Sequence, residues 1–154
     1  MTEVIQDIMT RHPSTVFVAD PLERAYRKMK ALNVRHLPVV NGAGKLVGIV
    51  SDRDFQRVMN RERVSEADES YTFDGCETVE DIMSWPVKAI SAGTTIRAAA
   101  SQMLQEKLSA LVIASADQHP VGIVTTDDFL RYLLDSDDRA FERPIYSGTE
   151  LRVR

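Results

Sequence analysis

The chain has 154 residues, which is the size of one ordinary domain or of two small repeats that share a core. Its longest apolar runs fall far short of the roughly 20 residues that a membrane helix needs, so no contact with a membrane is expected. The net charge of −4 does not indicate general binding to nucleic acid, which relies on positive charge. Cys76 is the only cysteine, and the N-terminus lacks the pattern of a signal peptide. These features predict a cytoplasmic protein without an intrachain disulfide.

The first half of the chain alternates short apolar segments with an amphipathic one. Proline ends the first segment, and the turn Asn41-Gly42-Ala43-Gly44 separates two apolar runs, which predicts a β-hairpin. The expected elements in chain order are a short helix at 4–10, a strand at 15–18, a helix at 22–32, strands at 34–40 and 45–50, and a helix after 51.

The amphipathic helix has a strong predicted start. Asp20 is a candidate N-cap, Pro21 suits the first helical turn, and Glu23 stands where a capping box needs an acid. Apolar residues then recur at steps of three and four, which is typical of a helix that packs one face on a core.

The segment 46–55 returns as 120–129, and this repeat decides the predicted organisation. Each matched pair is 74 positions apart, as in Gly48 and Gly122 or Ser51 and Thr125. We therefore predict a duplicated α+β fold in which each repeat is β-α-β-β-α, preceded by a short helix. The expected parts are repeat 1 at 1–60, an acidic connector at 61–77, repeat 2 at 78–135 and a C-terminal tail at 136–154. The tail is either a departing segment or a dimer arm.

Three motifs resemble one known family. They are Asp-Ile-Met-Thr at 7–10, echoed as Asp-Ile-Met-Ser at 81–84, then Val-Arg-His-Leu-Pro-Val-Val at 34–40, and Gly-Ile-Val-Ser/Thr-x-x-Asp at 48–54 and 122–128. Together they resemble the tandem cystathionine-β-synthase (CBS) domain pair, or Bateman module, over most of the chain. The resemblance implies a pseudo-twofold axis between repeats packed through their sheets. It also implies clefts that hold adenine nucleotides or related adenosyl ligands, and a homodimer of two modules.

The motifs Ser51-x-x-Asp54 and Thr125-x-x-Asp128 have two interpretations. At a strand-to-helix junction, this spacing is close to a capping box, which stabilises a helix without any ligand. A helix N-terminus also presents unpaired N–H groups that suit phosphate. The resemblance implies that Asp54 and Asp128 bind ribose and that Ser51 and Thr125 bind phosphate. The two interpretations are compatible.

The candidate phosphate cations are concentrated in the first repeat. Arg35, His36 and Arg53 are either solvated side chains or ligands of a nucleotide phosphate, for which a guanidinium is well suited. The second repeat has Ser109-Ala110 and Asp127 at the corresponding positions. We therefore expect the cleft of Asp54 to be the stronger phosphate site, with the cleft of Asp128 empty or filled by a less charged adenosyl ligand.

An adenine ring would need an apolar slot with backbone hydrogen bonds. For most of the candidate lining residues, ordinary core packing is the competing interpretation. Gly48 and Gly122, inside predicted strands, indicate a bulge or the close approach of another chain segment or ligand. The candidates for the slot are Val16, Leu37, Pro38 and Ile49 in one cleft and Ile90, Leu111 and Ile123 in the other.

Together with these residues, the resemblance implies a stand-alone regulatory module that binds AMP, ADP, ATP or a related adenosyl ligand and signals its occupancy to an unidentified regulated protein. The alternative is an interaction module with vestigial, ligand-free clefts, whose tail docks a partner. No enzymatic activity is expected, because the sequence has no Gly-x-Gly-x-x-Gly loop, no Walker A motif and no recognisable Ser–His–Asp arrangement. No metal or required cofactor is expected either, since the three histidines and the cysteine lack ligand spacing.

Overall fold

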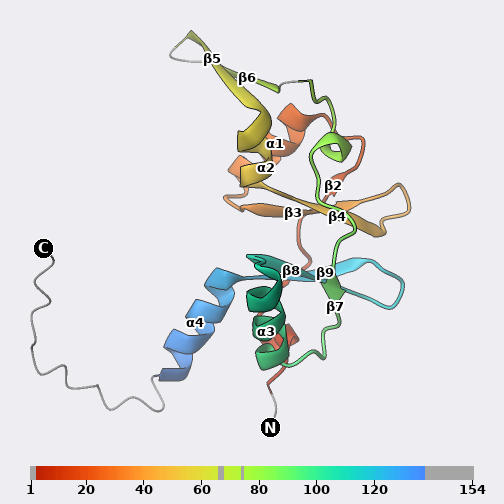
Figure 1. Ribbon diagram of the computed structural model, residues 1–154, viewed down its shortest axis with the longest axis vertical. Coiled ribbons are helices and arrows are strands. Elements are labelled where there is room, and N and C mark those ends of the chain that lie inside the picture. The colour runs from red at the N-terminus through yellow and green to blue at the C-terminus, as the bar shows by residue number, and fades with distance from the viewer. Residues whose placement is uncertain (1–2, 66–67, 74, 138–154) are drawn as a thin grey trace, which may run out of the picture.

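The computed structural model describes residues 3–65, 68–73 and 75–137, and these form four layers (Figure 1). Two sheets face each other in the middle, and a pair of helices covers the outer side of each sheet. This arrangement confirms the predicted α+β fold of two repeats packed through their sheets. Within the described residues, every helix is too short or too polar to cross a bilayer.

The first sheet has the order β2-β3-β4, with β2 (Val16–Phe17) parallel to β3 (His36–Val40) and β3 antiparallel to β4 (Leu46–Ser51). Helices α1 (Leu22–Ala31) and α2 (Asp52–Val58) cover it. The second repeat matches this pattern with elements whose bounds are β7 (Ala89–Ile90), α3 (Ile96–Glu106), β8 (Ala110–Ala114), β9 (Pro120–Thr125) and α4 (Thr126–Asp137).

The leading segment of each repeat packs into the core of the other repeat. The 3-10 helix η1 (Ile5–Asp7) and strand β1 (Thr10–Arg11) belong to the second half, where β1 pairs with β9. The Ile5 N–H donates to the Thr94 carbonyl at 2.7 Å, and the Ile5 side chain is fully buried in the second core. The matching helix η2 (Val79–Asp81) buries Val79 in the first core. Neither core is therefore complete without residues from the other repeat.

This exchange explains the two glycines inside the strands. A Cβ atom at Gly48 would lie 2.7 Å from the Met83 sulfur, and one at Gly122 would collide with the Met9 sulfur. Real Cβ atoms do not approach a neighbour so closely, so a side chain at either position would force the methionine of the exchanged segment to move. Both predicted alternatives occur, because the registers of β3–β4 and β8–β9 shift next to these glycines and the other repeat's leading segment packs closely against them.

The segment expected only as an acidic connector contains a regular hairpin. Strand β5 (Met59–Ser65) pairs antiparallel with β6 (Asp68–Phe73). Tyr71 packs edge-on against Tyr26 of α1, with ring centroids 5.0 Å apart, and Phe73 packs against Phe55 of α2 at 6.2 Å. The alternation of Tyr71 and Phe73 was the strand signal in an otherwise polar stretch.

The predicted cap of α1 was wrong. Pro21 holds the N-cap position and makes no side-chain cap bond. The Asp20 carboxylate instead accepts the N–H of Phe17 at 2.8 Å, and Glu23 accepts from Arg27 within the helix. Asp20 therefore closes the turn before the helix rather than the helix itself. Residues 138–154 lie outside the described part of the chain, so neither interpretation of the tail is tested.

Candidate functional site

The first predicted junction is a fully formed capping box. Ser51 ends β4, and its hydroxyl oxygen accepts the N–H of Asp54 at 3.3 Å. The Asp54 Oδ2 atom accepts the N–H of Ser51 at 2.7 Å and its hydroxyl at 2.8 Å. The structural interpretation of this motif is thus confirmed, because the motif stabilises the start of α2 without a ligand.

The second junction repeats the carboxylate half of this box. The Asp128 Oδ2 atom accepts the N–H of Thr125 at 2.7 Å and its hydroxyl at 3.0 Å. In the first half Arg57 donates to Asp54 Oδ1, whereas Arg131 stays 3.8 Å from Asp128 Oδ1. Asp54 is the only polar or charged side chain buried among the described residues, at 6% exposure.

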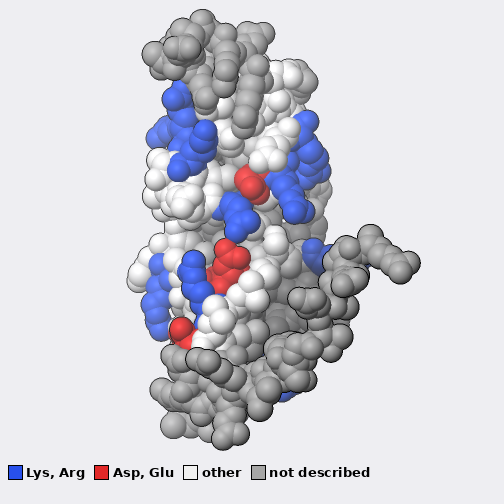
Figure 2. All heavy atoms as spheres, turned by 90° about the vertical axis from the view of Figure 1, so that its left-hand side faces the viewer, with Lys and Arg blue, Asp and Glu red and all other residues white. Residues whose placement is uncertain are grey.

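The fold brings the two junctions to one edge of the molecule. The Arg35 guanidinium reaches across the repeats to Asp127, with Nη2 and Oδ2 3.0 Å apart. Next to this pair, His36 Nε2 lies 3.0 Å from the Ser109 hydroxyl. Figure 2 shows this face, where basic side chains flank acidic ones at the level at which the two halves meet. An ion pair of two exposed side chains contributes little to stability, so a ligand could displace it at small cost.

His36 is the least suited of the three predicted cations to hold a phosphate by charge. Burial is the largest influence and lowers the pKa of His36, while Asp52 raises it and Arg35 lowers it. The imidazole is therefore neutral near pH 7 and offers a hydrogen bond instead of a charge. Of the three predicted cations, Arg35 and Arg53 remain as candidates to hold a phosphate by charge, because a guanidinium presents a planar fork of donors to it.

The predicted adenine-slot residues differ in their exposure. Three of them, Val16, Leu37 and Leu111, belong to the two cores, each with about 1% of its surface exposed. Pro38 and Ile123 are also buried, whereas Ile49 and Ile90 are half-buried. Only the half-buried pair presents appreciable side-chain surface, so the adenine slot stays a prediction.

Asp127 and Ser109 were not among the predicted site residues, although the repeat pointed to them. Ser109 is the counterpart of Arg35, and Asp127 is the counterpart of Arg53, each 74 positions along. Residues near a pseudo-twofold axis meet residues close to their own counterparts in the other repeat. The sequence shows the correspondence, but the contact across the axis does not follow from it.

Comparison with known proteins agrees with this geometry. The family model for the CBS domain matches residues 5–61 and 79–135. The chain belongs to the CBS domain family. It contains two CBS domains in tandem, as the three sequence motifs predicted.

Two solved structures share the fold of this CBS pair over nearly their whole length. A putative acetoin utilization protein (AcuB) from Vibrio cholerae is 28% identical, with a TM-score of 0.73, and the match covers 90% of this chain and 96% of that one. The CBS domain pair of protein MJ0100, solved with 5′-methylthioadenosine and S-adenosyl-L-methionine, is 25% identical with a TM-score of 0.70, covering 84% and 98%.

Curated relatives include much longer enzymes. A homoserine O-acetyltransferase from Methanocorpusculum labreanum is 27% identical over 123 residues, which is 80% of this chain but only 23% of that protein. This chain therefore spans about a quarter of the relative's length and matches it through the CBS pair. The match brings no acetyl-transfer activity to this chain.

Proposed function

We propose that this CBS pair is a regulatory module that binds an adenosine nucleotide or a related adenosyl ligand between its repeats. The observation that carries the proposal is the meeting of the two junctions at one edge. Each junction offers a helix N-terminus, a hydroxyl and a carboxylate, and Arg35 and Arg53 lie beside them. The MJ0100 pair, which has the same fold, was solved with two adenosyl compounds.

The hydroxyls and carboxylates at the two strand-to-helix junctions also suit a nucleoside. In this proposal Asp54 and Asp128 accept ribose hydroxyls, since a carboxylate oxygen has two lone pairs and can accept more than one bond. Phosphate oxygens would accept hydrogen bonds from Ser51, Thr125, Arg35 and Arg53, and His36 would add a hydrogen bond without a charge.

The adenine ring would lie against the half-buried Ile49 or Ile90. A ligand that touches both repeats favours one relative orientation of the halves, which a homodimer partner or another protein could detect.

The test of this function is a ligand panel on the full chain. Thermal unfolding would be measured with AMP, ADP, ATP, S-adenosylmethionine and 5′-methylthioadenosine, beside native mass spectrometry of whatever co-purifies. A ligand at 100 times its Kd adds about 2.7 kcal/mol to the free energy of unfolding if it binds only the folded state. If no adenosyl compound shifts the transition or co-purifies, the proposed function is wrong.

Arg35→Ala should lower the affinity for ADP and ATP by about tenfold and the affinity for adenosine much less, because the guanidinium would bind the phosphate and not the base. The fold should survive, since the ion pair with Asp127 is exposed. Isothermal titration calorimetry checks both expectations. A control is Lys88→Ala, which removes another ion pair of an exposed cation, with the half-buried Glu106. If adenosine suffers as much as ATP, the role of Arg35 is structural.

A further inference from the structure

Both repeats place an arginine three residues after the aspartate that is predicted to bind ribose. The pairs are Asp54 with Arg57 and Asp128 with Arg131, and they correspond at an offset of 74 positions. Residues three apart on a helix are neighbours on one face, so each arginine can reach its own aspartate. The proposed function gives neither arginine a role.

In the first repeat the arginine occupies the aspartate. Arg57 donates to Oδ1 of Asp54, while Oδ2 of Asp54 accepts the N–H and the hydroxyl of Ser51. The Asp54 side chain is 7% exposed and the Arg57 side chain is 74% exposed, so an exposed cation holds a buried carboxylate. A carboxylate has about four lone-pair sites for hydrogen bonds. Three of the sites on Asp54 are therefore in use.

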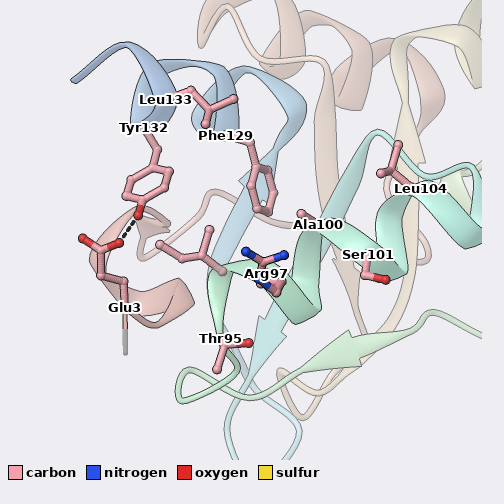
Figure 3. A pocket seen from close by; sticks show the side chains of 10 residues that line it. Glu3, Thr95, Arg97, Ala100, Ser101, Leu104, Phe129, Tyr132 and Leu133 are labelled. Carbon is pink, nitrogen blue, oxygen red and sulfur yellow. Dashed lines mark hydrogen bonds between the residues drawn. The ribbon is translucent and has the colours of Figure 1, made fainter. Parts of the chain in front are cut away.

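In the second repeat the aspartate is more open. Oδ2 of Asp128 accepts the N–H and the hydroxyl of Thr125, but Arg131 stays 3.8 Å from Oδ1, beyond hydrogen-bond distance. Within the described chain, no hydrogen bond is made to that oxygen. Figure 3 shows Phe129, the residue after Asp128, pointing towards Ala100 of α3. The packed face of α4 is therefore not the face that carries Asp128 and Arg131, and packing does not hold the arginine in place.

This difference matters for a ribose, which needs two acceptor sites if both of its hydroxyls donate. Asp128 has two such sites free, whereas Asp54 has one until Arg57 withdraws. The bonds from Ser51 belong to the turn that starts α2, so the long, exposed side chain of Arg57 is the partner that leaves. The hydroxyls of Ser51 and Thr125 are common to both clefts and do not distinguish them.

The cost of moving Arg57 depends on the ligand. An uncharged nucleoside would take the place of the guanidinium on Asp54 and give it no new partner. A nucleotide would give it one, because the planar fork of a guanidinium matches the oxygens of a phosphate. The side chain of Arg57 is exposed enough to make this move.

We propose that Arg57 is a specificity residue of the first cleft, which leaves Asp54 for the phosphate when a nucleotide binds. The first cleft then prefers nucleotides to nucleosides. The second cleft, whose aspartate is already open, accepts an adenosyl ligand with or without a phosphate. This inference rests on the proposed function, to which it adds the ligand class of each cleft.

Calorimetric titration of the full chain with adenosine and with ADP tests the proposal. An Asp128→Ala background restricts ribose binding to the first cleft. In that background Arg57→Ala should raise the affinity for adenosine by about tenfold and lower the affinity for ADP by about tenfold, since each change corresponds to one hydrogen bond to a charged group. Lys45→Ala is the charge-matched control, because Lys45 is exposed and precedes β4, at the opposite end of that strand from Ser51. It should change neither affinity by more than about twofold.

The opposite directions of the two shifts are the signature of the proposed role. A merely structural role of Arg57 would move both affinities the same way, and that result would overturn the proposal. Arg131→Ala in an Asp54→Ala background should change the affinity for adenosine little, since Arg131 makes no hydrogen bond to Asp128. A rise as large as in the first cleft would contradict the difference between the clefts.

A structure of the ADP complex gives a direct readout. The Arg57 guanidinium should lie within hydrogen-bond distance of a phosphate oxygen, and a guanidinium still bound to Asp54 would overturn the proposal. The two levels of inference fail differently. If neither adenosine, ADP nor any other adenosyl compound binds the unaltered chain, the proposed function is wrong and this inference falls with it. If ligands bind and Arg57→Ala shifts adenosine and ADP together, only the role of Arg57 is wrong.

Discussion

Replacing Ile5→Ala should lower the free energy of unfolding by about 2–5 kcal/mol, and the damage should appear in the second repeat. Ile5 stands at the start of the chain, yet its side chain is fully buried among residues of the second core, such as Ile96 and Val124. Removing it leaves a cavity beside α3 and β9, while the packing of the first sheet is untouched. Urea unfolding gives the energy, and hydrogen exchange resolved by segment gives the location.

Val79→Ala is the mirror-image control. Val79 follows the connector in the sequence but is buried in the first core, so its loss should loosen β3 and β4 instead. The opposite pattern, with Ile5→Ala loosening the first repeat, would contradict the exchange of leading segments. A Val→Ala change removes fewer atoms than Ile→Ala, so its energetic cost should also be smaller.

Asp54→Ala should weaken any ribose-containing ligand by about 100-fold or more, the second large effect we expect. Hydrogen bonds to a charged group contribute about 1.5–3 kcal/mol each, and the carboxylate would accept both ribose hydroxyls. The first repeat also carries Arg35 and Arg53, so its cleft should hold the phosphate more strongly. Calorimetric titration with the ligand that the panel identifies measures the loss.

Asp128→Ala supplies a control for folding. Both changes remove a carboxylate that accepts the N–H of the residue before a helix, Ser51 in one repeat and Thr125 in the other. A general effect of the lost cap should therefore appear in both variants, at about 1 kcal/mol of stability. Asp128→Ala should leave most of the phosphate-dependent affinity. Equal losses of affinity would show that the two clefts are equivalent.

Much of the fold was predictable because the relevant signals are local. The return of Gly-Ile-Val-Ser/Thr-x-x-Asp after 74 positions indicated a duplication, and the turn 41–44 between two apolar runs indicated the β3–β4 hairpin. The capping box at Ser51 and the bonds between Thr125 and Asp128 also follow from spacing within a single turn of chain. The turn and the caps depend on residues three or four positions apart, and comparing the sequence with itself reveals the duplication.

The tertiary structure decided which core each segment joins. The side chains of Ile5 and Val79 have the same apolar character whichever repeat buries them, so the sequence alone could not show that the leading segments are exchanged. The same holds for the contact between Arg35 and Asp127, which lie 92 residues apart. The β5–β6 hairpin likewise packs Tyr71 and Phe73 against Tyr26 of α1 and Phe55 of α2, a contact that the polar sequence around them does not specify. Local patterns determine elements, but which surfaces meet depends on long-range packing, because apolar burial has no preferred direction along the chain.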